Sequence, residues 1–163
     1  MIKKAFTWTL FCACLLLPAV VQAFGIVSGS VSFKPPDRSI LPAGYVRILL
    51  TRTPAKIPEL PDLNKLNTQE RMETIRNLHM NFFLSVRQNL SDPEFLVQSG
   101  LSTPEGAFQF SDVPAGKFYL VVTFPAMVRD YKLAWQVPVK VHANETCQVV
   151  LNNENLLLPT YSR

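Results

Sequence analysis

The sequence predicts a mainly β protein: a β-sandwich of about seven strands with Greek-key-type connections and one amphipathic helix inserted at about residues 68–90. Three observations predict this fold. Short runs alternate apolar and polar residues, glycine and proline separate these runs, and one stretch changes to the period of a helix. Short alternating runs with turn signals between them are typical of two packed sheets.

The first 23 residues have the pattern of a secretory signal peptide. Lys3 and Lys4 precede an apolar run, and Val21 and Ala23 occupy the two positions that a signal peptidase inspects. We expect cleavage after Ala23, with an uncleaved membrane anchor as the alternative, and a periplasmic or secreted location in a bacterium. Residues 24–163 are then expected to form a single domain with no membrane span.

Charge and cysteine content narrow the classes of function. Removal of the signal peptide leaves 14 of the 16 basic residues against 12 acidic ones, and this weak bias argues against nucleic-acid binding. Only Cys147 follows the expected cleavage site, so no internal disulfide can form. Cys147 alternates with apolar neighbours and is predicted to lie inward as a small hydrophobe, with a reactive thiol as the alternative.

The expected strands each have one inward-facing row of apolar side chains at every second position. Strands are expected at 25–33, 45–51 and 94–101, around Phe108 and Phe110, from Phe118 to Phe124, and at 134–141 and 146–152. The predicted inward residues are Val27, Gly29, Val31, Phe33, Val46, Ile48, Leu50, Phe108, Phe110, Phe118, Leu120, Val122, Phe124, Val137, Val139, Val141, Cys147, Val149 and Leu151.

The most specific pattern is the segment TPEGAFQFSDVPAGKFYL, residues 103–120. One turn at Glu105-Gly106 and a second at 113–116 each lead into a strand with alternating aromatic residues. This pattern resembles the signature of the carboxypeptidase regulatory-like domains, which are small β-sandwiches of the transthyretin-like, or prealbumin-like, type. The resemblance covers residues 25–51 loosely and 100–152 better, and it implies a fold more than an activity.

The insertion at 54–93 departs from that family pattern. Its first part is a proline-bearing linker, and the helical period follows from about Thr68 to Leu90. Asn67 is placed to cap the helix, and Glu70 is placed to reach back to it in a capping box. Pro93 disfavours helical backbone at the residue before it, so we expect the helix to end near Leu90.

The apolar stripe of this helix is expected to dock on the sandwich. It consists of Ile75, Leu78, Phe82, Val86 and Leu90. Full burial of its first four members is worth about 6–12 kcal/mol as an upper bound, which is too much to leave in water. Outward positions of the expected strands, namely Leu49, Tyr119 and Val121, are the candidates to receive it. The alternative is that the stripe faces a partner protein or a membrane.

The sequence predicts no catalytic residue, cofactor site or metal site. His79 and His142 lie on separate elements without metal-ligand spacing, and no phosphate-binding loop or nucleophile elbow is visible. The loop at 129–135 is the one candidate contact region. Arg129, Tyr131 and Trp135 could contact a sugar or a protein partner, whereas the alternative for Trp135 is burial in the core.

These observations favour a non-catalytic accessory or interaction module of the cell envelope that binds an envelope protein, a role that the resemblance also implies. The alternative is a carbohydrate-binding module that uses the 129–135 loop to bind a glycan. A third reading is a hydrolase on a prealbumin-like scaffold. It is disfavoured because the terminal Tyr161-Ser162-Arg163 differs in order from the motif of hydroxyisourate hydrolases, whose N-terminal histidine motif is also missing.

Overall fold

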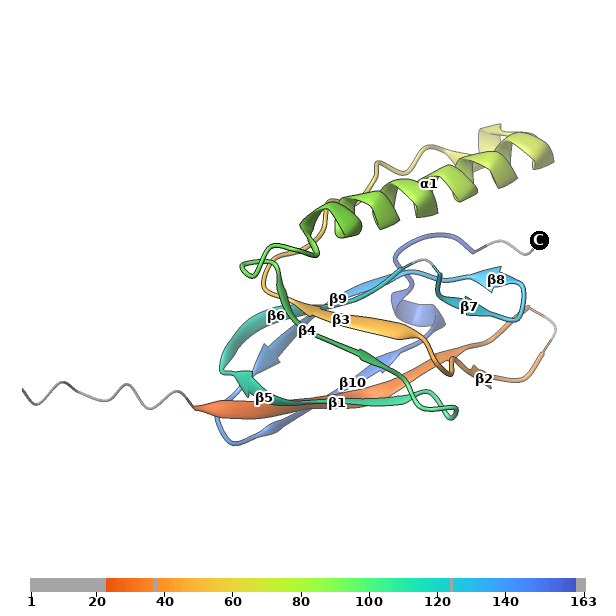
Figure 1. The fold of residues 1–163 in the computed structure, drawn as a ribbon. Helices are drawn as coiled ribbons and strands as arrows, with labels where there is room; N and C mark the ends of the chain where they lie inside the picture. Colours follow the sequence, from red (N-terminus) through yellow and green to blue (C-terminus); the bar gives the residue numbers. More distant parts are fainter. Residues whose placement is uncertain (1–22, 37, 124, 161–163) are drawn as a thin grey trace, which may run out of the picture.

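The computed structural model describes residues 23–36, 38–123 and 125–160, which form a two-layer β-sandwich with one long helix across an outer face (Figure 1). The predicted fold class is confirmed. The predicted signal peptide, apart from Ala23, lies outside the described residues, as does Phe124. The elements are β1 (Phe24–Phe33), β2 (Leu41–Pro42), β3 (Arg47–Thr51), η1 (Leu63–Lys65), α1 (Thr68–Asn89), β4 (Leu96–Leu101), β5 (Ala107–Pro114), β6 (Gly116–Val122), β7 (Met127–Val128), β8 (Tyr131–Lys132), β9 (Trp135–Val141), β10 (Thr146–Leu151) and η2 (Asn153–Asn155).

The first sheet is built around β1, which pairs with β5 on one side and β10 on the other. The pairing with β5 is antiparallel and that with β10 is parallel, so Val27 lies opposite both Phe110 and Cys147. The short strand β2 pairs with the last residues of β1. The second sheet has the order β4-β3-β6-β9 and is antiparallel throughout. The first strand of the domain is therefore an inner strand, and its last strand is an edge.

The core between the two sheets follows the predicted alternation. Val27, Val31 and Phe33 of β1 are buried against Ile48 and Leu50 of the facing sheet. Phe108, Phe110, Phe118, Leu120, Val122, Val139, Val141 and Leu151 join them. The predicted inward residues Val137, Cys147 and Val149 pack on this core but are only partly buried. Their strands, β9 and β10, are the last strands of their sheets and are covered on one side only.

The two turns of the 103–120 pattern differ from each other in the structure. At the first, Gly106 has a φ of +83°, and a Cβ there would lie 2.3 Å from the carbonyl oxygen of Val31. Glycine is therefore required on both grounds. At the second, β5 continues as far as Pro114 instead of ending at Asp112. Ser111 and Asp112 together lie opposite Ile26, which makes a β-bulge, and Asp112 has a φ of +55°.

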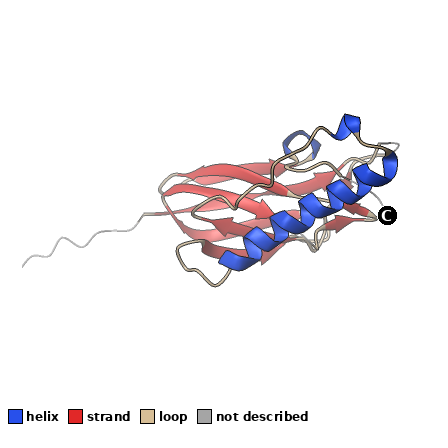
Figure 2. Ribbon diagram, turned by 90° about the horizontal axis from the view of Figure 1, so that it is seen from above, coloured by secondary structure: helices blue, strands red, loops and turns tan. Residues whose placement is uncertain are grey.

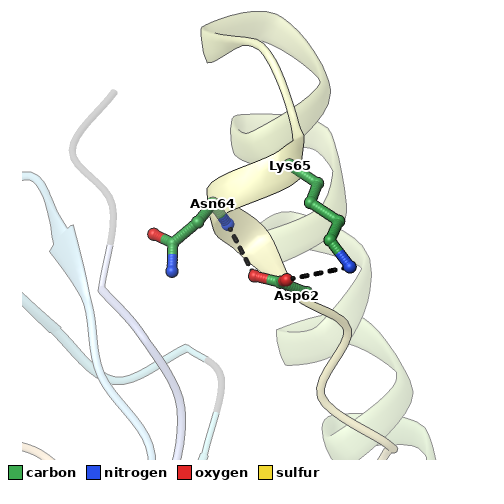
Figure 3. Close-up of polar contacts among 3 residues, drawn as sticks. All are labelled: Asp62, Asn64 and Lys65. Carbon is green, nitrogen blue, oxygen red and sulfur yellow. Dashed lines mark hydrogen bonds and ion pairs between the residues drawn. The ribbon is translucent and has the colours of Figure 1, made fainter.

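The helix begins as the sequence predicts. The side chain of Asn67 accepts a hydrogen bond from the Glu70 N–H at 2.9 Å, and the Glu70 carboxylate accepts one from the Asn67 N–H at 3.1 Å. The preceding turn, η1, is capped in a similar way by Asp62, which accepts from the Asn64 N–H at 3.2 Å and pairs with Lys65 at 3.3 Å (Figure 3). This ion pair is exposed and contributes little to stability.

The predicted docking of α1 on the sandwich is confirmed, since the helix runs along the outer face of the second sheet (Figure 2). Leu78, Phe82 and Val86 pack in one cluster with Leu49 and Val121, and Tyr119 borders it. Other segments complete this layer. Gln136 exchanges hydrogen bonds with Ala55 of the linker at 2.8 and 3.2 Å, and the C-terminal segment adds Leu158. The insertion is therefore an integral third layer.

Candidate functional site

The loop predicted as a contact region forms the hairpin β7–β8 (Figure 1). Val128 pairs with Tyr131, and the turn between them contains Arg129 and Asp130. Both turn residues are exposed, and Arg129 has a φ of +54°. Residues other than glycine seldom adopt this left-handed region of backbone angles, so the hairpin holds Arg129 in an unusual backbone conformation.

The three predicted contact residues do not form one surface. Trp135 is 0% exposed, and its indole N–H donates to the Asn152 carbonyl oxygen at 2.8 Å. Tyr131 is half-buried, with its ring 5.2 Å from that of Phe33 and tilted by 47°. A residue that stacks on a sugar needs an exposed ring face, which Trp135 lacks. Trp135 is therefore a core residue, the alternative that its sequence context left open.

His79 lies on the buried face of α1 and is 3% exposed. Its Nε2 lies 2.9 Å from the carbonyl oxygen of Pro159, which ties the helix to the C-terminal segment. Burial lowers the pKa of His79 below 6.5; the bond to Pro159 opposes this shift and the charge of Lys132 adds to it. His142 is exposed. Within residues 23–36, 38–123 and 125–160, no group of histidine, cysteine and acidic side chains could hold a metal ion.

A cavity of about 100 Å³ lies between the C-terminal half of α1 and the second sheet. It is lined by Arg47, Leu49, Phe83, Val86, Arg87, Leu90, Thr123 and Pro125. We refer to these eight residues as the helix-end cavity. Sequence reasoning missed it, although one signal was present. Arg47 and Leu49 share the outward face of β3, so docking of the helix on Leu49 also brings it close to Arg47.

Two arginines and one threonine supply the polar groups among the residues that line this cavity. Among the described residues, neither Arg47 nor Arg87 forms a hydrogen bond or ion pair through its guanidinium group. Thr123 is 9% exposed, and within the same part of the chain its hydroxyl has no hydrogen-bond partner. Buried hydroxyls are paired in most proteins, so this one is unusual.

One side of α1 combines exposed apolar and basic residues. Met72, Met80 and Leu84 are each 41% exposed, and the chain also exposes Arg76 and Arg87 there. These five residues are spaced by three or four positions and so lie along one side of the helix, which we call the Met/Arg side. The acidic Glu73 also lies on this side, and the other exposed side carries Glu70 with the uncharged Asn77, Asn81 and Gln88. No helix in the described part of the chain is both long and apolar enough to cross a membrane.

Neither a protein-family model nor a curated protein matches the chain. Among solved structures, a minor pilin of Streptococcus agalactiae is similar at 14% identity and a TM-score of 0.47, over 87% of this chain and 48% of the pilin. A candidate carbohydrate-binding protein of Pseudomonas aeruginosa is similar at 13% identity and a TM-score of 0.44, over 80% of this chain and 89% of that protein. The major pilin subunit of Bacillus cereus is similar at 15% identity and a TM-score of 0.41, over 82% and 30% respectively.

The chain thus spans about half of the first pilin and under a third of the second. Likenesses this distant carry no argument about what this chain binds. The β-sandwich architecture is given by the two sheets described above. The carboxypeptidase regulatory-like subtype remains a resemblance of sequence.

Proposed function

We propose that the chain is an exported, non-catalytic interaction module that binds a protein partner of the cell envelope through the Met/Arg side of α1. The observation that carries this proposal is the exposure of Met72, Met80 and Leu84, each 41%, on a helix whose apolar stripe is already buried. Export rests on the signal-peptide pattern. The start of β1 at Phe24, directly after the expected cleavage site, fits a domain that begins there.

A docked helix with a second apolar side is a common way to present a binding surface. The burial of Leu78, Phe82 and Val86 fixes the helix, so the helix loses little conformational entropy when a partner binds. Methionine side chains adapt to varied partner shapes. Exposed apolar side chains that lie together along one side of an element indicate an interaction surface, whereas single scattered ones do not. The complementary partner has an apolar groove with acidic residues at its edge, which would face Arg76 and Arg87.

A photo-crosslinking residue placed at position 80 or at position 81 tests the proposal, because Met80 lies on the Met/Arg side and Asn81 on the other exposed side. In bacteria that export the protein, we expect position 80 to capture a defined envelope protein and position 81 not to. Met80→Glu should remove that same protein from material co-purified with the mature chain. Equal capture at both positions, or capture at neither, would contradict the proposal.

The carbohydrate-binding alternative loses its main residue, because the ring of Trp135 is enclosed in the core. Arg129 and Tyr131 remain predicted contacts of the hairpin for a partner. The hydrolase reading was disfavoured by the sequence of Tyr161, Ser162 and Arg163, which lie outside the described residues, and we do not propose it.

A further inference from the structure

We infer that the helix-end cavity binds a short aliphatic carboxylate, with the hydrocarbon tail in the cavity and the head group between Arg47 and Arg87. This inference concerns a small-molecule site and goes beyond the partner surface proposed above. It stands on the size of the cavity and on the two arginines at its wall.

The volume and walls of the cavity fit a short hydrocarbon chain. A cavity of about 150 Å³ with apolar walls accommodates benzene, so about 100 Å³ leaves room for about four carbon atoms. Most of the wall is apolar, from Leu49 of β3 to Val86 and Leu90 at the end of α1. A tail of this size would gain contacts with these apolar side chains.

The charged residues of the wall select an anion. Arg47 comes from β3 and Arg87 from α1, so the two arginines line the cavity from separate layers of the molecule. No acidic residue is among the eight described residues that line the cavity. Guanidinium groups bind carboxylates through two parallel hydrogen bonds, and in this wall they have no competing carboxylate.

Thr123 belongs to the wall, but its hydroxyl is enclosed and does not open into the cavity. The charged groups of the wall are therefore the two arginines, and two cations match an anionic head group.

Titration of the ¹⁵N-labelled mature chain with hexanoate tests the inference, with hexylammonium as the control of equal length and opposite charge. We expect hexanoate to cause saturable amide shifts around Leu49, Leu90 and Thr123, and hexylammonium to leave them unchanged. Acetate, which has the head group without the tail, should bind at least tenfold more weakly than hexanoate. Equal binding of the two six-carbon probes, or shifts scattered over the whole surface, would overturn the inference.

Substitutions then locate the head group. Arg47→Gln and Arg87→Gln should each weaken hexanoate binding by about two- to fivefold, which is the range for an exposed ion pair. Arg76→Gln is the matched control, because Arg76 lies on the same helix but outside the cavity. Should Arg76→Gln weaken hexanoate as much as Arg87→Gln, the site is not the cavity. Capture of a protein at position 80 does not depend on this result, so the two proposals can fail separately.

Discussion

The core between the two sheets and the layer beneath α1 are both apolar, yet they are assembled differently. The inner core has the side chains of long strands facing each other, with Val27, Ile48 and Leu120 at 0% exposure. The layer beneath α1 combines a helix, a linker and the C-terminal segment, and it contains a buried histidine, an unpaired hydroxyl and the helix-end cavity. The core between the sheets is thus fully apolar at these positions, whereas the layer beneath the helix leaves room for polar groups and for a cavity.

The largest effect is expected in the inner core. Trp135→Ala should lower the free energy of unfolding by about 3–5 kcal/mol, because it removes the largest fully buried side chain and leaves the Asn152 carbonyl without its donor. Urea unfolding followed by circular dichroism measures the change. Tyr131→Ala is the comparison, since Tyr131 is only half-buried and should cost less. A wild-type stability for Trp135→Ala would contradict its place in the core.

A matching truncation beneath the helix should have a smaller and more local effect. Phe82 is 0% exposed, and Phe82→Ala should cost about 3 kcal/mol, because a helix held on one face can shift to fill part of the space. Hydrogen exchange should show faster exchange in α1 while the amides of β1 keep their protection. Loss of protection in both elements at once would show that the two layers unfold as one unit.

Removal of the unpaired hydroxyl should stabilise the protein. Thr123→Val keeps the shape of the side chain and should raise the free energy of unfolding by about 1–2 kcal/mol, since no hydrogen bond within the described residues is lost. Thr51→Val is the matched control, because the buried hydroxyl of Thr51 donates to the Thr53 carbonyl at 2.8 Å and its removal should destabilise. Chemical unfolding of both variants at neutral pH measures whether the free energy of unfolding rises for Thr123→Val and falls for Thr51→Val.

The smallest expected effect is a pH dependence that arises from His79. Burial lowers the pKa of His79 in the folded chain below its ordinary value of 6.5, so the unfolded chain takes up the proton first as the pH falls. The contribution to stability is complete above pH 6.5 and is lost as the pH falls through the lower folded pKa. His79→Gln should flatten the stability curve in this acid window, whereas substitution of the exposed His142 should leave it unchanged.

Much of the fold could be predicted from the sequence because it depends on local rules. Alternation placed Val27, Ile48 and Leu120 in the core, and the capping box of Asn67 and Glu70 gave the start of α1. The burial of Trp135 also had a signal, since it lies two positions before Val137 and four before Val139, on the inward side of the same strand. Trp135 was nevertheless named as a candidate contact residue, because aromatic residues are enriched at binding surfaces.

The helix-end cavity could not be predicted in the same manner. It depends on how closely Val86 and Leu90 approach Leu49, and these residues are about forty positions apart in the chain. Periodicity states which faces meet but not where their side chains fail to fill the space between them. The unpaired hydroxyl of Thr123 likewise results from tertiary packing, because a threonine at the end of a strand has no sequence feature that reveals its partner.

The position of β1 has a consequence for the order in which the molecule can be assembled. One neighbour of β1 is β10 (Thr146–Leu151), so the sheet around β1 is complete only once residues 146–151 have been made. Contacts between strands so far apart in the chain slow folding. Until β10 joins it, one edge of β1 has unpaired backbone groups, which are open to pairing with another chain.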